Sequence, residues 1–374
     1  MSIIKTDEIQ ARTSGNRVVL PDVNNYPPFR NLIINGDMSI AQRGTSATGI
    51  GNGDSGYHTV DRWQFTEVGT TSGEFTITQD TDVPTGQGFA KSTKFDVTTA
   101  DTSLGSTHQI YWRQGFEGQN LQMLKKGTSN AEQITVSFWV KSNKTGTYIV
   151  YILDGDNSRF VSKSYTISSS STWEKKTITF PADTTGTLDN DNAKSLTVHF
   201  VLGAGTDFTS GTLQETWGAV SGNNANRLVG QVNLLDSTSN EWYITGVQLE
   251  VGDSATPFEF LPFDMNLKRC QRYLQKFTCA DSTFNVFGTG VKTGATSVEI
   301  PVPLKTTMRA KPSLSSSGLR YRDATAIDSS ITIGGTYTDR DFPMLQLSNS
   351  TATDSAGFLQ GASSSDFLQF DAEL

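Results

Sequence analysis

Hydrophobic and polar residues alternate along most of this chain, in short segments that end at Gly, Asn, Asp or Ser. In "ITVSFWVK", which begins at Ile134, every second residue is aliphatic or aromatic, whereas Thr135 and Ser137 lie on the opposite side. A period of two is typical of a strand with one buried face in an antiparallel sheet. Many such segments, without helical periodicity between them, predict a jelly-roll-like antiparallel β-sandwich over residues 31–262. Its clearest predicted strands are residues 31–36, 59–67, 74–79, 133–142, 147–153, 173–180, 195–202 and 241–251.

The two ends of the chain differ from this long central zone. Residues 279–374 repeat the alternation on a smaller scale, which predicts a smaller C-terminal β domain. Residues 1–30 contain one short apolar run, "RVVLPDV", and the paired prolines of "NNYPPFR". Because such a segment is too short to bury a core, we expect an extended attachment arm. The strands predicted for the C-terminal domain are residues 283–290, 297–304, 330–337, 342–348 and 366–374.

One segment, "DMNLKRCQRYLQKF" from Asp264 to Phe277, departs from the alternating pattern. At 100° per residue its apolar side chains fall on one side of a helix and its four cations on the other. We therefore predict a short amphipathic joint helix over residues 263–278, with Asp264 as its N-cap.

The apolar side of the predicted helix has the 3-4-3 spacing of a short coiled coil. A helix of about 13 residues is marginal in isolation, so this stripe has to pack against something. Two partners remain open, namely one of the chain's own sheets or the same helix from two sister chains on a shared axis. In the second case the chain is a homotrimer, and its oligomerisation residues are Leu267, Cys270, Leu274 and Phe277.

Composition narrows the class of protein. Hydrophobic residues make up 35% of the 374 positions and charged residues 18%, with small polar residues in their place, which fits a loop-rich β protein. A formal net charge of −8 argues against a nucleic-acid partner. No segment approaches the roughly 18 consecutive apolar residues of a membrane span, and the start lacks an apolar signal region. We therefore expect folding in a cytoplasm, no membrane insertion, and reduced thiols at Cys270 and Cys279.

The motifs of common enzyme sites are missing from the sequence. It contains no G-x-S-x-G, H-E-x-x-H, P-loop or helix-opening G-x-G-x-x-G motif, and no carboxylate pair can be nominated by spacing. Its three histidines, His58, His108 and His199, lie in unrelated segments. The aspartate clusters at 154–156 and 189–191 lack the EF-hand pattern, so we expect solvated turns there. We therefore expect no catalytic residue, no metal and no cofactor.

A sugar-binding surface makes smaller demands on the sequence. It needs an aromatic ring to stack on a pyranose and polar side chains to bond its hydroxyls. Trp217 lies in the polar loop "QETWGAVSGNNANR", and Trp112 in "QIYWRQG" is a second candidate. The candidate ligand-binding residues around Trp217 are Glu215, Asn223, Asn224 and Arg227. Local packing remains the alternative for Trp217, and for Trp63, Trp139, Trp173 and Trp242 we expect core or rim packing.

Several motifs, in this order along the chain, resemble those of bacteriophage tail fibre and tail spike proteins of the marine or cyanobacterial type. Residues 2–22 are similar to the N-terminal segments of such fibres. "CQRYLQKF" at 270–277, followed by "IPVPLKTTMRAKPSL" at 300–314, resembles a C-terminal module with Cys-Gln-Arg-Tyr and Met-Arg-Ala-x-Pro motifs. The closing "FLQFDAEL" resembles the last strand of that module.

The central zone resembles a galactose-binding-type carbohydrate module. The resemblance rests on "NLIINGDMSIAQRG" near its start and on "YITGVQLEVGDSATPFE" at its end. Many such modules carry an acidic pair in the last strand that helps to hold a structural calcium. Thr245 and Gly246 occupy those positions here, so we do not expect that calcium site.

These resemblances imply a virion structural protein, a trimeric tail fibre or spike on the exterior of a phage particle that is assembled in the host cytoplasm. Its attachment arm would dock on another tail or adaptor protein, and its β domains would contact host cell-surface polysaccharide. A capsid-decorating virion protein and a free carbohydrate-binding adhesin of prophage origin remain alternatives. A polysaccharide-degrading enzyme is disfavoured, because no catalytic motif is found.

Overall fold

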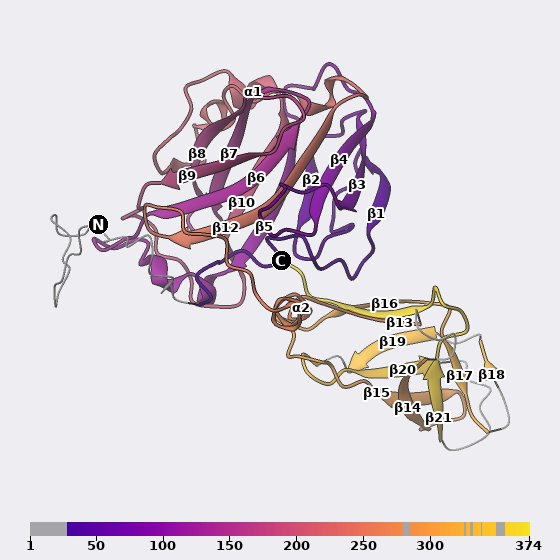
Figure 1. The fold of residues 1–374 in the computed structure, drawn as a ribbon. Coiled ribbons are helices and arrows are strands. Elements are labelled where there is room, and N and C mark those ends of the chain that lie inside the picture. The colour runs from indigo at the N-terminus through magenta and orange to yellow at the C-terminus, as the bar shows by residue number, and fades with distance from the viewer. Residues whose placement is uncertain (1–27, 280–284, 325–326, 330–331, 338, 349–355) are drawn as a thin grey trace, which may run out of the picture.

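The structure, a computed structural model, describes residues 28–279, 285–324, 327–329, 332–337, 339–348 and 356–374. These residues are mainly β, which confirms the predicted fold class. Figure 1 shows a large sandwich and a smaller β domain, with the helix α2 (Phe263–Gln271) between them. The attachment arm predicted for residues 1–30 lies outside the described residues as far as position 27.

Two six-stranded antiparallel sheets form the sandwich. Sheet A has the strand order β1-β3-β4-β12-β6-β9, and sheet B has the order β11-β8-β7-β10-β5-β2. The strands of sheet A are β1 Ser46–Gly51, β3 Glu74–Asp80, β4 Ser92–Thr99, β12 Glu241–Val251, β6 Ile134–Ser142 and β9 Glu174–Phe180. Those of sheet B are β11 Gly218–Ala219, β8 Arg159–Ile167, β7 Gly146–Asp154, β10 Lys194–Ala204, β5 Gln109–Glu117 and β2 Gln64–Val68.

Inner-face side chains of both sheets form one hydrophobic core. Phe138 of β6 contacts Phe200 of β10 edge to face, with ring centroids 5.0 Å apart. Trp63 stacks on Trp112 of β5 at 5.9 Å. The alternation in the sequence therefore separates the two faces of β6 correctly: Phe138 is fully buried and Trp139 lies on the outer face.

Several segments of the sandwich differ from the prediction; for example, the strand predicted at 59–67 begins only at Gln64. Residues 31–36 form no strand, because asparagine side chains take the place of ladder bonds there. Asn31 accepts from the amide of Leu249 at 3.0 Å, and Asn35 donates to the carbonyl of Ile40 at 2.8 Å. Conversely, the polar stretch "TGIGNGDSG" contains part of β1, which pairs with β3.

The C-terminal domain contains a three-stranded sheet of order β13-β22-β16 and a seven-stranded sheet of order β18-β17-β21-β14-β15-β20-β19. Its core is separate from that of the sandwich, and it includes Leu345, Leu347, Leu368 and Phe370. The strands of the smaller sheet are β13 Leu274–Thr278, β22 Phe367–Asp371 and β16 Ser313–Ser317. Those of the larger sheet are β18 Ile327–Asp328, β17 Arg320–Arg322, β21 Ala356–Gln360, β14 Val286–Lys292, β15 Ser297–Pro301, β20 Met344–Ser348 and β19 Thr332–Tyr337.

The joint helix α2 (Phe263–Gln271) is shorter than the predicted 263–278. Its N-cap is Pro262, whereas Asp264, the predicted cap, lies in the first turn. After Gln271 the chain enters β13, which pairs with β22 at the end of the chain. The helix prediction is wrong beyond Gln271 because this long-range strand pairing overrides the local helical periodicity.

The predicted coiled-coil seam is therefore not continuous. Leu267 and Cys270 belong to α2, whereas Leu274 and Phe277 belong to β13. Cys270 and Leu274 are fully buried within their own chain, and Phe277 contacts Phe370 edge to face. Within one chain, Cys270 packs with Ile34, Ile40 and Tyr273, and Leu267 is partly buried against this cluster. Assembly of three helices on one axis stays a prediction. Both Cys270 and Cys279 are buried free thiols.

Four 3₁₀ helices of three residues each lie in loops of the sandwich, together with a four-residue helix, α1. Within the described part of the chain, none of the helices is long and apolar enough to span a bilayer. The bounds are α1 Thr206–Thr209, η1 Gly118–Asn120, η2 Gln122–Leu124, η3 Asn224–Asn226 and η4 Leu234–Asp236.

Candidate functional site

Trp217, the main candidate from the sequence, precedes the edge strand β11 and is engaged within the chain. Its indole N–H donates to the carbonyl of Pro181 at 2.8 Å, and its ring packs against the sandwich core. The Nζ of Lys126 lies 5.0 Å from the ring centroid. Both the polar group and the ring of Trp217 therefore have structural partners.

The polar residues predicted to surround Trp217 also have partners in the chain. Glu215 pairs with Lys163 at 3.0 Å, and Asn223 donates to a main-chain carbonyl at 2.9 Å. Arg227 is buried, donates to Asn224 at 2.6 Å, and lies over an aromatic ring of β8. These contacts stabilise the loop against sheet B. They do not make the five residues converge on a ligand.

Trp112 is buried in the core with no exposed surface, so the prediction that it contacts a ligand is wrong. It lies on β5, where Ile110 and Trp112 face the core. Tyr111, between them, belongs to a cluster on the opposite face of sheet B. Large apolar residues occupy both phases of this strand, so alternation alone could not tell which side faces the core.

A groove of about 530 Å³ lies on the outer face of sheet A. Trp139 and Ser137 of β6 line it, and these residues are two positions apart on the same side of the strand. Lys175 of β9 pairs with Trp139 across the ladder and lines the groove as well. Neighbouring strands thus bring an indole, a hydroxyl and an ammonium group together.

Three phenylalanines form a wall of the groove. The ring of Phe89 lies 5.0 Å from that of Phe258 and 5.1 Å from that of Phe260, which is 51% exposed. Gly246 of β12 makes room for them: its φ is +61°, and a Cβ there would lie 2.5 Å from the Phe89 ring. Glycine is thus required at position 246, both for the backbone conformation and for the approach of Phe89.

Four polar side chains of the groove have no hydrogen-bond or ion-pair partner among the described residues, whereas the hydroxyl of Thr256, which also lines it, donates to Glu250. The four groups are the indole N–H of Trp139, the hydroxyl of Ser137, the ammonium of Lys175 and the side-chain amide of Gln87. Donors of this kind, next to aromatic rings in a concave surface, are available for the hydroxyl groups of a bound molecule.

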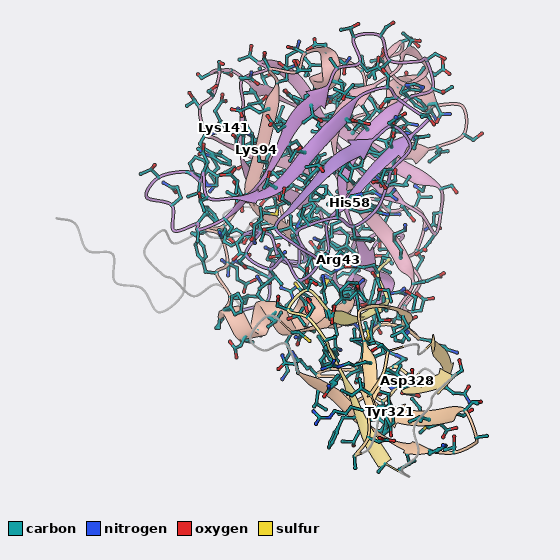
Figure 2. All side chains as sticks on the ribbon, turned by 90° about the vertical axis from the view of Figure 1, so that its right-hand side faces the viewer. Arg43, His58, Lys94, Lys141, Tyr321 and Asp328 are labelled. Carbon is teal, nitrogen blue, oxygen red and sulfur yellow. The ribbon has the colours of Figure 1, made fainter. Side chains whose placement is uncertain are left out.

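A row of charged and aromatic residues flanks the groove on the same face of sheet A. Lys141 and Lys94 lie near each other there (Figure 2), with Nζ atoms 4.0 and 5.5 Å from the ring centroid of Tyr243. Burial raises the pKa of Tyr243, and its hydrogen bond to Glu241 raises it further. Lys94 also pairs with Glu241 at 3.0 Å, so this row is held by its own contacts.

Trp139 could have been recognised in the sequence from its phase. In "ITVSFWVK" it occupies the polar side of the alternation, together with Thr135 and Ser137. An indole at a solvent-facing position of a strand is a candidate for ligand contact. Lys175, Phe258 and Phe260 carry no such signal, because only the strand pairing and the fold of the 255–260 segment bring them to Trp139.

The aspartates of the 154–156 cluster do not all form the expected solvated turn. Asp154 is fully buried and pairs with the ammonium of Lys126, which also lies 3.0 Å from Asp183. The prediction is wrong for Asp154, because an ion pair formed through the fold compensates its charge.

Comparison with solved structures finds distant likenesses, among them the following three. No protein-family model and no curated protein matches the chain. Among solved structures, the enzymatically active domain of bacteriophage CBA120 tailspike protein 4 matches at 15% identity and a TM-score of 0.32, over 60% of this chain and 22% of that one. A family 4 carbohydrate-binding module matches at 13% identity and 0.30, over 58% and 97% of the two chains. The family 11 module of Clostridium thermocellum matches at 10% and 0.28, over 58% and 98%.

The present chain therefore spans about a fifth of the tailspike domain and nearly all of each carbohydrate-binding module. These identities and TM-scores are too low to assign an activity. The functional conclusion rests on the side chains of the groove.

Proposed function

We propose that this protein is a non-catalytic glycan-binding protein, and that the groove on the outer face of sheet A receives the saccharide. The observation that carries the proposal is the set of donors on Trp139, Ser137 and Lys175, which have no partner in the described part of the chain and lie next to an aromatic wall. An aromatic ring packs on the apolar face of a sugar, and the donors bond its hydroxyls. The volume of about 530 Å³ lies within the roughly 300–1,000 Å³ typical of small-ligand sites.

The biological setting that we propose is a virion, with the chain as a tail fibre or spike that contacts host cell-surface polysaccharide. The order of the sequence motifs supports this, from the N-terminal segment to the Cys-Gln-Arg-Tyr and Met-Arg-Ala-x-Pro motifs. Residues 1–30 would attach the protein to another virion protein, and three copies would assemble on one axis. A capsid-decorating protein or a prophage adhesin would use the same groove.

Multiple copies would compensate for a weak single contact. One groove with a few hydrogen bonds and a stacking contact is expected to hold glycan in about the millimolar range, near −4 kcal/mol. Several copies on one particle raise avidity by roughly 10²–10⁴ without any new contact. Host-cell binding by the assembly should therefore be much tighter than glycan binding by a single chain.

The test compares two tryptophan variants. An array of bacterial surface polysaccharides identifies a ligand for the full chain, and calorimetry then measures its affinity. Trp139→Ala should weaken binding by about 5- to 10-fold, the equivalent of about 1–1.4 kcal/mol. Trp217→Ala is the matched control and should leave the affinity unchanged. Loss of binding with Trp217→Ala but not with Trp139→Ala would place the ligand at the loop and overturn the groove assignment.

A further inference from the structure

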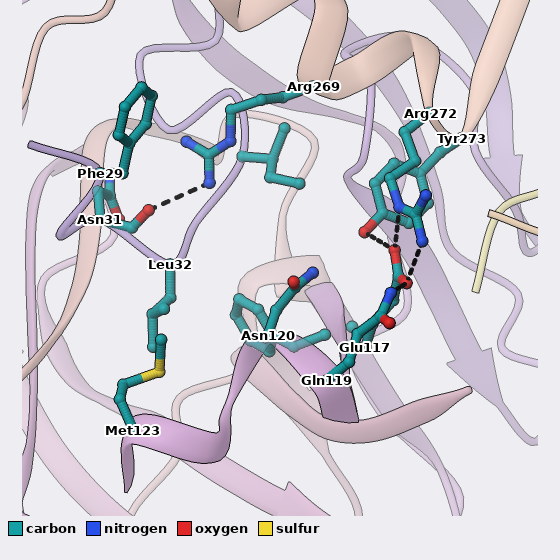
Figure 3. Close-up of a pocket in the computed structure, with 13 residues that line it drawn as sticks. Phe29, Asn31, Leu32, Glu117, Gln119, Asn120, Met123, Arg269, Arg272 and Tyr273 are labelled. Atoms are coloured by element: carbon teal, nitrogen blue, oxygen red, sulfur yellow. Dashed lines mark hydrogen bonds and ion pairs between the residues drawn. The ribbon is translucent and has the colours of Figure 1, made fainter. Parts of the chain in front are cut away.

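A second cavity, of about 450 Å³, lies where α2 meets the sandwich, and its lining includes no residue of the groove on sheet A. Figure 3 shows that α2 and the residues after it bring two arginines to this cavity, Arg269 and Arg272. The 29–32 segment and the η1–η2 region complete its walls. We call it the joint pocket.

Arg272 uses its charge inside the protein. Its Nε and Nη2 donate to the two carboxylate oxygens of Glu117 at 2.7 and 2.6 Å, and the hydroxyl of Tyr273 donates to Glu117 at 2.5 Å. Burial would raise the pKa of Glu117, but hydrogen bonds from Arg272 and Tyr273 outweigh it and lower that pKa. At this end of the joint pocket, the ion pair between Arg272 and Glu117 connects the residue after α2 to strand β5 of the sandwich.

Arg269 has no such partner. Among the described residues its side chain makes one hydrogen bond, from Nη2 to the carbonyl of Asn31 at 3.2 Å, and no carboxylate lies within 4.0 Å. Glu259, the acid that acts on it from farther away, accepts from the amides of Phe29 and Asn31 and lies 3.7 Å from Arg30. Burial lowers the pKa of Arg269, although the charge of Glu259 acts in the opposite direction.

The joint pocket is also lined by one side-chain amide without a described partner and by two exposed apolar side chains. The amide of Asn120 points into the cavity from the side opposite Arg269 (Figure 3), and it has no partner in the described part of the chain. Phe29 is 53% exposed and Met123 48% exposed. Phe29 also has a φ of +58°, a left-handed conformation that is unfavourable for a bulky residue. A hydrogen bond from the main-chain N–H of Phe29 to the carboxylate of Glu259 holds the residue in this conformation.

We propose that the joint pocket binds an acidic sugar unit, with the sugar carboxylate on Arg269, a hydroxyl group on the amide of Asn120, and the apolar face of the ring on Phe29. A guanidinium with no carboxylate partner, in a partly desolvated cavity, favours an anion with in-plane oxygens. The exposed ring and the free amide suit a ring that carries hydroxyls. That the ligand is a sugar rests on the proposed function, whereas its negative charge rests on the contacts of Arg269.

The probe is a short oligomer of galacturonic acid, and its fully methyl-esterified form is the neutral control. Both would be titrated into the full chain by calorimetry. The acid should bind at least tenfold more tightly than the ester. Arg269→Gln should remove that tenfold preference, so that the acid and the ester bind with similar affinity. Lys268→Gln is the matched control, because it removes a positive charge from the residue that precedes Arg269 in α2. Lys268 is exposed and does not line the joint pocket. The Lys268→Gln variant should still bind the acid at least tenfold more tightly than the ester.

A second variant guards against a loss of fold in Arg269→Gln. Asn120 is exposed and its side chain has no partner among the described residues, so Asn120→Ala should fold normally and weaken acid binding by about 3- to 10-fold. Equal binding of acid and ester, or acid binding that is lost in Trp139→Ala but kept in Arg269→Gln, would overturn the joint-pocket proposal and leave the groove proposal standing. Equally tight binding of an acidic tripeptide would overturn the sugar assignment.

Discussion

The guanidinium of Arg62 pairs with the carboxylate of Glu373, the penultimate residue of the chain, and the two side chains are only 1% and 4% exposed. The same guanidinium donates to the carbonyl of Gly115 at 2.9 Å and lies 3.4 Å from the ring centroid of Tyr273. Arg43 adds a second contact to Glu373, at 3.4 Å. The C-terminal tail is thus tied to the sandwich through a buried ion pair between residues 311 positions apart.

Glu373→Gln should lower the free energy of unfolding by about 3–5 kcal/mol, because it leaves the buried charge of Arg62 without its carboxylate. Chemical denaturation measures this loss. Glu132→Gln is the control: Glu132 pairs with Lys125, but both side chains are at least 40% exposed, so its loss should cost about 1 kcal/mol or less. Equal stability of Glu373→Gln and the wild type would contradict the role given to this pair.

A pH dependence should arise from Asp61. Its carboxyl is fully buried, and burial raises its pKa to about 6, although hydrogen bonds from Gln42 and the charge of Arg43 act in the opposite direction. The folded state then binds the proton more tightly than the unfolded state. The stability from this group is therefore present below about pH 4 and lost as the pH rises through about 6.

The measurement is the difference in unfolding free energy between the wild type and Asp61→Asn, from pH 4 to pH 7.5. Because asparagine does not titrate, the wild type should lose about 2–3 kcal/mol relative to the variant over this range. Asp264→Asn, at an exposed position of α2, controls for the loss of a carboxylate. A difference that stays constant with pH would rule out this role for Asp61.

Gly246→Ala should destabilise the sandwich and reshape the groove. The new Cβ would meet the ring of Phe89, and the left-handed backbone adds strain, for a loss of about 1–3 kcal/mol. Gly222→Ala separates the two effects, since Gly222 has a φ of +78° but open space around its Cβ position. Glycan affinity should fall in Gly246→Ala alone. Unchanged affinity there would show that the phenylalanine wall does not contact the ligand.

Leu274→Ala tests whether the predicted seam residue supports the chain itself or an oligomer. Leu274 is fully buried within one chain, so its truncation should lower the free energy of unfolding by about 2–5 kcal/mol. The sedimentation coefficient of the folded protein should not change. Leu267→Ala, at a half-buried position of α2, should cost less. Dissociation of a trimer without loss of chain stability would restore the coiled-coil hypothesis.

The alternating pattern of the sequence was sufficient to predict a mainly β chain with a sandwich. In β6 the phase that contains Phe138 is apolar and the opposite phase is largely polar, so one local pattern determined both the strand and its core-facing side. Thr135, Ser137 and Lys141 of the other side are buried as well, outside that core. In β5 apolar residues occupy both phases, so the burial of Trp112 was decided by the tertiary structure. Alternation therefore identifies the core-facing side of a strand only where one phase is apolar and the other is polar.

Tertiary structure alone decided where α2 ends and which residues form the two cavities. Leu274 has helical spacing from Cys270, yet pairing with β22 places it in a strand. Lys175 reaches Trp139 only through the register of β9 against β6, and Glu373 reaches Arg62 only after both domains have folded. Residues close in sequence interact through the period of the local backbone. Contacts between residues far apart in the sequence depend on how all the elements between them pack. A short segment of sequence does not contain that information.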